Sequence, residues 1–579
     1  MKNFLFILIL TFCSKSFAQT VQGRASEAPT SFTSDLDLSQ SGTNSNAAEI
    51  LNQSTSLFLK DSGVKTFSMR GSPAREVSVS LEGVPLNSEA QGEFDFNNFS
   101  LFGLESARII RGGYTPNSSS PSGEIQFQLP QENKFKTSLG IGSYETYFIG
   151  QQIPHASFAY EQSENNYSFK QNGISQKREH NAHKKVAARA WKQSENFQVW
   201  GQVLYSDQEM PGSLSWVTPQ ASMKSFAPML AAQYQIKTLT TSAWSRFQNQ
   251  SDQQPDSFRQ TTNRWLSCGV KIQNRHGVSK NLSFEETFIW NLDKLWTTQR
   301  ENSIETSTPI PYRQSISGIL SATLSPNSSH LIHPRVRVDY LSDLDEEHLA
   351  INPGIGGRHS LLKNFGLLWN AAYLSKAPSF TDMYMEALPY AISNPNLKRQ
   401  RSLQGDFGYE FSQTRTLKLK QAFFASRNLN YLRSSQVNNI WQVKNLGTSV
   451  ILGLENEARF QPAEFFVMSL NYTLQRVSLD DHQASYQPTH LWHSNFEFFP
   501  NEPVGFDFPL YARSSVQIDP NSSNEISSQW DFGFHSRAQI RKWFFDLRIF
   551  NLLGWQRMEV DGYPLASEIH GKISATYRF

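Results

Sequence analysis

The chain has few cysteines, no long apolar run and almost no net charge. Cysteine occurs only at Cys13 and Cys268. Cys13 lies in a segment with the features of a removable export signal, so only Cys268 would remain and no intramolecular disulfide could form. No segment has 18 or more consecutive apolar residues, which excludes a transmembrane helix. Lys plus Arg number 53 and Asp plus Glu 51, a net charge of +2 that favours no nucleic-acid partner.

Motifs of the common enzyme classes are also missing. The sequence contains no G-x-S-x-G nucleophile motif, no P-loop and no dinucleotide-binding fingerprint. It also lacks a dense aspartate cluster of the kind that binds calcium. His180 and His183 are three residues apart, as are His490 and His493, and an odd spacing on a strand sends the two side chains to opposite faces. We therefore expect ordinary polar residues there, no resident metal or cofactor, and no enzyme.

The first eighteen residues predict export from the cytoplasm. Lys2 supplies the positive start, residues 4–12 the apolar run, and Ser16 to Ala18 a small-residue cleavage site. Lipid attachment at Cys13 is the alternative, but the bulky Phe12 before it fits that modification poorly. An exported chain without a membrane helix is either soluble or a membrane β-barrel.

Alternating strands dominate the sequence from about residue 134 onward. Hydrophobic residues make up only 38% of the chain while aromatic residues make up 13%, which suits strands that are apolar on one face only. Strict alternation occurs in the segments 197–206, 335–340, 417–420, 545–549 and 571–579. Ten-residue segments of this kind, separated by turn residues, are the signature of a transmembrane antiparallel β-barrel. Roughly 450 residues at about 20 per strand predict about 22 strands, a size at which barrels are plugged.

The stretch from Val64 to Glu124 predicts that plug. Residues 67–69 and 77–81 have strand patterns, a short helix is expected at 47–51, and a helical turn at 104–107 should lead into the strand 108–111. Together they predict a small mixed α/β domain of roughly 100 residues. Gly71, Gly83 and Gly112 sit where strands must turn sharply, which favours positive φ. The Ser-rich residues 117–122 predict a loop.

These patterns divide the chain into four parts. We expect a signal peptide at 1–18, a periplasmic N-terminal segment at 19–45, a plug domain at 46–130 and a β-barrel domain at 131–579. The short distance between the signal and the plug leaves no room for an additional N-terminal signalling domain.

Eight short motifs occur in an order that resembles a known family, the TonB-dependent outer-membrane receptors, and most of all its vitamin B12 and siderophore receptors. The resembling segments are, in order, Val21–Ser34, Arg70-Gly71, Glu82–Asn87, Arg111-Gly112, Pro211–Ser213, Ser375–Phe380 with Asn394–Leu397, Asn445–Gly447 with Gly453–Glu455, and Asn551-Leu552 with the terminal Phe579. The likeness covers nearly all of the chain after the signal. The chain departs from the family pattern at Glu82, at Tyr114-Thr115 and at Ser122-Gly123.

The resemblance implies that Arg70 and Arg111 hold the plug to glutamates of the barrel wall. A guanidinium group suits this role because it stays charged and forms bidentate bonds to carboxylates. Glu455 is the first candidate partner and Glu410 the second. The alternative is that each arginine only bonds nearby loop carbonyls.

The resemblance also implies a set of partners. Residues 19–23 (Gln19, Thr20, Val21, Gln22, Gly23) are a candidate TonB box, which would add a strand to the TonB C-terminal domain in the periplasm. The other expected partners are outer-membrane lipid, the barrel-assembly machinery through the C-terminal strand ending in Phe579, and a small metal-chelate ligand. We expect a monomer.

Candidate ligand contacts come from loops expected above the plug. They are Asn87, Glu89, Gln91, Glu93, Trp216 and Tyr384. Solvated loop residues without a ligand are the alternative reading of each one.

The function implied is high-affinity uptake of a large, scarce chelate of the siderophore or cobalamin type. A passive porin is one alternative, although it would lack the plug. A barrel enzyme such as a lipase is a second, but it needs a Ser/His site that the sequence does not offer. A receptor-like barrel that adheres or signals without transport is a third, because the plug departs from the family pattern at Tyr114 and Ser122.

Overall fold

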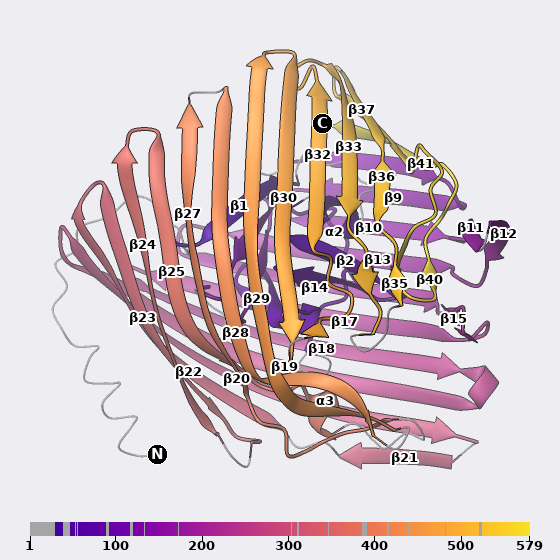
Figure 1. The fold of residues 1–579 in the computed structure, drawn as a ribbon, viewed down its shortest axis with the longest axis horizontal. Coiled ribbons are helices and arrows are strands. Elements are labelled where there is room, and N and C mark those ends of the chain that lie inside the picture. The colour runs from indigo at the N-terminus through magenta and orange to yellow at the C-terminus, as the bar shows by residue number, and fades with distance from the viewer. Residues whose placement is uncertain are drawn as a thin grey trace.

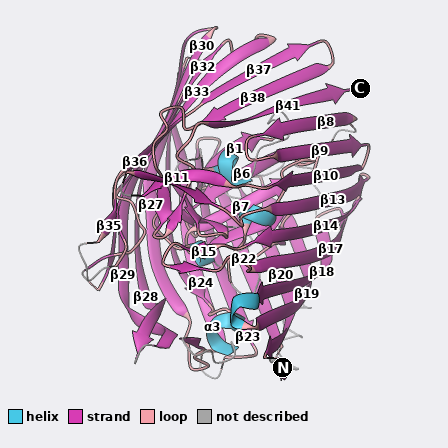
Figure 2. Cartoon of the chain, turned by 90° about the vertical axis from the view of Figure 1, so that its right-hand side faces the viewer, coloured by secondary structure: helices cyan, strands magenta, loops and turns pink. Residues whose placement is uncertain are grey.

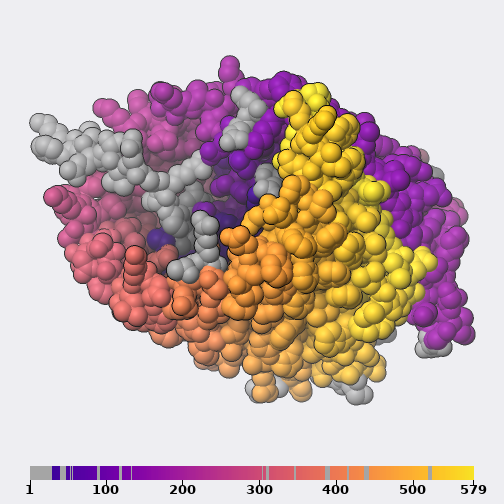
Figure 3. Space-filling model, turned by 90° about the horizontal axis from the view of Figure 1, so that it is seen from above, coloured from indigo at the N-terminus to yellow at the C-terminus, as the bar shows by residue number. Residues whose placement is uncertain are grey.

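The computed structural model forms a closed β-barrel around a small N-terminal plug (Figure 1). It describes residues 29–38, 47–52, 54, 56–87, 92–115, 120–131, 134–171, 173–302, 304–309, 312–344, 347–384, 391–413, 416–437, 440–480, 482–519 and 524–579. In Figure 3, indigo atoms of the N-terminal region are seen within the hollow that the purple, magenta, orange and yellow atoms surround. The residues after about 134 thus enclose those before them.

Twenty-two long antiparallel strands build the barrel in the described part of the chain. They are β8 (Lys136–Gly142), β9 (Thr146–Ile153), β10 (Ala156–Ser163), β13 (His183–Gln193), β14 (Phe197–Glu209), β17 (Ser222–Ile236), β18 (Leu239–Gln254), β19 (Arg259–Ser279), β20 (Leu282–Glu301), β22 (Arg313–Asn327), β23 (His330–Leu341), β24 (Leu349–Leu362), β25 (Phe365–Lys376), β27 (Gln400–Gln413), β28 (Leu417–Val437), β29 (Ile440–Ala463), β30 (Phe466–Leu479), β32 (His490–Phe498), β33 (Val504–Arg513), β36 (Gln529–Phe532) continued by β37 (Phe534–Ile540), β38 (Trp543–Phe550) and β41 (His570–Arg578). The last strand, β41, pairs with β8 from Lys572↔Gly142 to Arg578↔Lys136, which closes the ring. The expected barrel is confirmed.

The wall strands bury many polar side chains on their inner face and expose apolar ones on their outer face, the reverse of a soluble protein. On β8, Ser138 is fully buried while its neighbour Leu139 is 55% exposed. On β23, Arg335, Arg337 and Asp339 are buried and Tyr340 is exposed. A closed ring pairs every strand edge, and an apolar outer band matches lipid. The alternation in the sequence therefore encodes a membrane-facing surface.

The two ends of the barrel differ in the length of their connections. At the end that carries Phe579, consecutive strands are joined by two to five residues, as at 237–238 and 499–503. At the other end the connections reach 19 residues or more, as at 164–182, 377–399 and 551–569. Figure 2 shows α3 (Phe380–Tyr384) among these longer connections. Short periplasmic turns and long extracellular loops are typical of outer-membrane barrels, so the long-loop end is the outer mouth.

The plug is built on a five-stranded sheet in the order β1-β6-β7-β4-β5. Its strands are β1 (Phe32–Asp37), β4 (Val77–Leu81), β5 (Val84–Pro85), β6 (Ser106–Arg111) and β7 (Gly123–Gln128). The helix α2 (Ala47–Leu51) and the hairpin of β2 (Leu57–Asp61) and β3 (Lys65–Met69) complete it. The expected helix at 47–51 is confirmed. The helical turn expected at 104–107 is wrong, because β6 begins at Ser106 and pairs on both sides with β1 and β7.

Plug and barrel share one hydrophobic core. Plug residues such as Phe99 and Phe127 belong to the same buried cluster as the wall residues Trp191, Trp200 and Trp244. The sheet of the plug is therefore stabilised by the inner wall as well as by its own packing.

No helix among the described residues is long and apolar enough to cross a membrane.

The outer face predicts a depth-dependent cost for charge. Leu230 lies in the middle of β17 and is 62% exposed, while Ile236 ends that strand on the same face and is 50% exposed. We expect Leu230→Arg to destabilise the barrel in lipid by about 2–4 kcal/mol and Ile236→Arg by about 0–1 kcal/mol. Denaturant titrations of each variant in bilayers measure this difference. Equal costs at the two positions would contradict a lipid-facing surface.

Candidate functional site

Arg70 is the centre of an ion-pair cluster between plug and wall. It follows β3 and adopts a left-handed backbone conformation with φ 51. Its Nε and Nη2 donate to the two carboxylate oxygens of Glu455, each at 2.7 Å, and its Nη1 donates to Asp406 Oδ1 at 2.8 Å. The guanidinium also lies 4.7 Å from the centre of the Phe424 ring. One plug side chain thus contacts three adjacent strands, β27, β28 and β29.

Arg111 extends the cluster by one more carboxylate. At the end of β6, its Nη1 pairs with Glu457 Oε1, and its Nε lies 3.8 Å from Glu455 Oε2. Plug hydroxyls fill the remaining positions: Ser56 donates to Glu455, and Ser34 donates to Glu457 at 2.9 Å. Two plug cations therefore face three wall anions.

Burial makes these contacts strong and costly to break. Arg70 is 4% exposed, Arg111 2% and Glu455 2%. Burial by itself lowers the pKa of Arg70, but the charges of Asp406 and Glu455 more than offset this and raise the pKa above its ordinary value. Arg70 therefore stays protonated at every pH the protein meets. Removing one partner from such a buried pair leaves an uncompensated charge.

Two glycines allow the close approach. A Cβ atom on Gly112, at φ +83, would lie 2.5 Å from Asp406 Oδ2 and 3.1 Å from Arg70 Nη1. A Cβ atom on Gly71 would lie 2.3 Å from Val477 Cγ2 of the wall. The glycine that follows each arginine thus permits both the local turn and the close contact between plug and wall.

The sequence identified one wall partner and missed two. Arg70 and Glu455 are brought together, but Glu410 is a correction: it pairs with Arg358 at 2.9 Å and Lys420 at 3.6 Å. Asp406 lies four residues earlier on the same face of β27 and is the partner of Arg70 in place of Glu410. The alternation of polar and apolar residues shows which side chains face inward, but it does not show how far along the barrel axis each one lies. Glu457 could have been found, since it lies two residues from Glu455 on the same face.

The chain entering the plug is fastened beside this cluster. Ser31 donates to the carbonyl of Tyr114 at 2.9 Å, and Lys420 of the wall donates to the carbonyl of Thr33 at 2.9 Å. Phe32 is 1% exposed and packs on Leu368 and Ala422 of the wall. We call residues 30–34 the entry segment. Through Ser34 it shares Glu457 with Arg111.

Tyr114, where the sequence departs from the family pattern, also contacts the wall. Its hydroxyl donates to the carbonyl of His333, and its ring lies 4.6 Å from the guanidinium of Arg335. Arg335 in turn donates to the carbonyl of Thr115. The plug's altered end is thus packed against β23.

The other side of the plug is held by neutral acceptors. Arg189 on β13 donates to the carbonyls of Ser100 at 2.7 Å and Phe102 at 2.8 Å. Arg246 on β18 donates to the carbonyls of Leu86 and Asn87. In the order of strands around the ring, β13 lies eleven strands from β28. The ion pairs of Arg70 and Arg111 therefore lie on one side of the barrel, and Lys572 of β41 pairs separately with Glu49 of α2.

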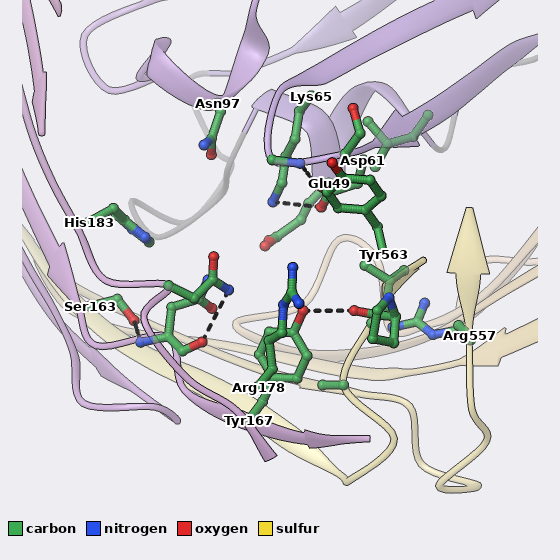
Figure 4. A pocket seen from close by; sticks show the side chains of 18 of the residues that line it. Glu49, Asp61, Lys65, Asn97, Ser163, Tyr167, Arg178, His183, Arg557 and Tyr563 are labelled. Carbon is green, nitrogen blue, oxygen red and sulfur yellow. Dashed lines mark hydrogen bonds and ion pairs between the residues drawn. The ribbon is translucent and has the colours of Figure 1, made fainter. Parts of the chain in front are cut away.

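A cavity of about 1220 Å³ lies between the plug and the remaining wall. It is lined by plug residues from α2 and the β2–β3 hairpin, by loop residues of the outer mouth, and by residues of β9, β10, β13, β14, β30, β32, β33 and β41. Figure 4 shows Asp61 and Lys65 of the plug facing Arg178, Tyr167 and Tyr563 of the loops. This volume suits a compact organic ligand.

Of the described candidate ligand residues, one lines the cavity and three do not. Trp216 lines the cavity and is 72% exposed. Asn87 closes the β4–β5 turn, accepting from Val79 N and donating to the Val77 carbonyl, and Tyr384 donates to the Asp343 carbonyl. Glu93 lies near Lys60 and Arg75, and burial raises the pKa of its carboxyl. None of these three lines the cavity.

Some predicted residues fall outside the described ranges. They are Glu89, Gln91 and the candidate TonB box at 19–23.

Among the described residues, no three His, Cys, Asp or Glu side chains gather in a way that could hold a metal ion.

Two protein-family models match this chain. A family model described as TonB-dependent Receptor Plug Domain matches residues 24–123, and one described as TonB dependent receptor-like, beta-barrel matches residues 86–552. No curated protein matches the sequence.

Solved structures share the fold at low identity. The siderophore receptor PirA from Acinetobacter baumannii is 13% identical, with a TM-score of 0.74, covering 94% of this chain and 98% of that one. A ferric enterobactin receptor mutant from Pseudomonas aeruginosa in complex with enterobactin is 14% identical, with a TM-score of 0.72, covering 96% and 100%. The copper transporter OprC is 11% identical, with a TM-score of 0.77, covering 96% and 99%.

The ion-pair cluster predicts a large effect for Arg70. Arg70→Ala leaves Glu455 and Asp406 buried without their cation, and we expect the plug to lose about 3–5 kcal/mol of stability. Arg108→Ala is the matched control, because Arg108 pairs with Asp35 at the plug surface and should cost less than about 1 kcal/mol. Guanidinium titrations read out by protease cleavage within the plug measure both. No difference between the variants would contradict the importance of the cluster.

The glycine contacts predict a second difference. Gly83 and Gly112 have similar positive φ, but a Cβ atom on Gly83 would meet nothing within 4 Å. Gly83→Ala should cost only the left-handed conformation, about 1–2 kcal/mol. Gly112→Ala should cost several kcal/mol more because it displaces Asp406 from Arg70. The same titration tests this, and equal losses would show that the contact with Asp406 is unimportant.

Proposed function

Because this chain belongs to the TonB-dependent receptor family, we propose that it binds a metal chelate of siderophore type at the outer mouth and imports it across the outer membrane with energy from TonB. The observation that carries the proposal is a plug that fills the barrel and is tied to its wall by buried ion pairs. Passage of a large solute requires those ties to be rearranged. A passive porin would have no use for them.

We propose that Arg70 and Arg111 are the latches of the plug, with Glu455, Asp406 and Glu457 as their wall partners. Support comes from the bidentate geometry at Glu455 and from the glycines that admit close contact. Buried pairs of this kind are strong only while both partners stay in place. A small displacement of the plug would therefore remove most of their attraction at once.

The entry segment is our candidate for the connection to TonB. The candidate box at 19–23 would add a strand to the TonB C-terminal domain. Tension on it would be transmitted along the chain to residues 30–34, the first described segment that is bonded to the wall. Loss of the Ser34 contact would weaken the position of Glu457 against Arg111. Work done at the N-terminus could in this way open the latch.

We propose that the cavity is the ligand chamber. Its size, its aromatic lining and its opening among the outer loops support this. The domain division stated from the sequence, with a signal peptide at 1–18 and an N-terminal segment at 19–45, remains part of the proposal. The monomeric state, the contact with lipid and the assembly signal at Phe579 belong to it as well.

The proposal predicts that binding and uptake separate when the N-terminus is shortened. Deletion of residues 19–26 should abolish import of a radiolabelled ferric chelate into cells and leave its binding to the cell surface unchanged. Val21→Pro should do the same because proline cannot donate within an added strand, while Val21→Thr should retain import. Import that persists after the deletion would rule out this placement of the TonB box. Full binding without import in the unaltered chain would favour a receptor that does not transport.

A further inference from the structure

We propose that the imported ligand carries no net negative charge, so that it is a neutral or cationic metal chelate. This inference rests on the proposed function and narrows its substrate class. It comes from the distribution of charge around the cavity.

The near-zero charge of the chain conceals a strong division between the two ends of the barrel. Among the described residues, the connections at the outer mouth contain fourteen Asp and Glu but only six Lys and Arg. The described turns at the opposite end contain three acidic and five basic residues. Four of the mouth carboxylates pair with arginines outside these connections: Asp343, Glu347, Asp382 and Glu559. The ten that remain still outnumber the six basic residues, so a solute approaching from outside meets a negative field.

Four Lys and Arg side chains of the cavity lining pair with neighbouring carboxylates, while Arg178 donates to the carbonyl of Gly212. Lys65 pairs with Asp61 at 3.6 Å, Lys185 with Glu161 at 3.4 Å, and Lys572 with Glu49 at 2.8 Å. Arg557 pairs with Asp531 in the same lining. Binding of a polyanionic chelate would have to break these pairs, whereas a neutral chelate leaves them intact. Like the outer loops, the cavity therefore offers little free positive charge to an anionic ligand.

Aromatic rings and polar groups without partners provide the remaining surface. Trp216, Tyr144, Tyr167 and Tyr563 line the cavity, and aromatic faces attract cations and apolar groups but repel anions. Tyr144 Oη and His493 Nε2 have no hydrogen-bond partner among the described residues, and His493 is 94% buried on the cavity wall. These groups could hydrogen-bond the amide or carbonyl oxygens that surround a neutral metal complex.

A series of chelates on one scaffold isolates the effect of charge. A ferric linear tris-hydroxamate with a free ammonium group has charge +1, its N-acetyl form 0 and its N-succinyl form −1. Binding of each to the full-length protein in detergent is followed by quenching of tryptophan fluorescence. At about 10 mM salt we expect affinity to fall roughly fivefold for each added negative charge, and the differences to shrink at about 0.5 M salt. A ferric tris-catecholate of charge −3 should bind most weakly of all.

A second measurement tests the field without any chelate. The fluorescence contributed by Trp216 is the difference between the unaltered protein and Trp216→Phe. The efficiency of each ion is first divided by its efficiency towards free N-acetyltryptophanamide, because iodide is intrinsically the stronger quencher. On this scale and at low salt, cesium should quench the Trp216 signal at least threefold more efficiently than iodide does. The pair Asp256→Asn and Glu301→Gln, both exposed on the cavity lining, should reduce that preference. The matched pair Glu195→Gln and Glu502→Gln, in turns at the opposite end, should not change it.

The outcomes separate this inference from the function on which it rests. Tighter binding of the tris-catecholate than of every hydroxamate would overturn the charge assignment and leave chelate uptake standing. Preferred quenching by iodide would overturn it as well. If no ferric chelate binds while cesium remains the preferred quencher, the field is present and the proposed function itself is contradicted.

Discussion

Buried charge that must be paired across two parts of the chain is the constraint on which this structure depends. Arg70 and Arg111 belong to the plug, while Asp406, Glu455 and Glu457 belong to the wall, more than 290 residues away in sequence. Neither set could remain buried alone, since desolvation of an unpaired charge costs several kcal/mol. The plug therefore has one stable position in the barrel. The glycines at 71 and 112 contribute to that position by letting the plug backbone approach the wall.

The same arrangement gives the barrel two unlike sides. On the side of β27, β28 and β29, ion pairs and the entry segment hold the plug. A cavity remains on the side that runs from β30 through β41 to β14, and the plug lines it with residues of α2 and the β2–β3 hairpin. Arg189 and Arg246 hold the plug through hydrogen bonds to its carbonyls, and Lys572 through an ion pair with Glu49. The cluster of Arg70 and Arg111 and the cavity thus lie on different strands, and the entry segment lies beside the cluster.

The sequence predicted the architecture well because alternation and turn spacing are local properties. The barrel, its strand number, the plug and the helix at 47–51 followed from them. Pairing across the barrel was harder. Glu455 was identified within a family motif, but the second candidate, Glu410, lies on the same inner face as the actual partner Asp406 and differs from it only in depth. The turn expected at 104–107 failed because tertiary pairing extends β6 to Ser106. Asn87 and Tyr384 could not be separated from Trp216, since exposure of a loop residue depends on how its loop folds back.

The central claim is that the N-terminal chain and the ion-pair cluster form one connected unit. Single-molecule pulling on a handle at the N-terminus, with the full-length barrel held in a bilayer, tests this most directly. The account predicts an early rupture event whose force falls clearly in Ser34→Ala and further in Glu457→Gln, but not in Asp35→Asn, whose side chain pairs with Arg108 at the plug surface. A rupture force that is the same in all four proteins would show that tension bypasses the cluster, and would contradict the account.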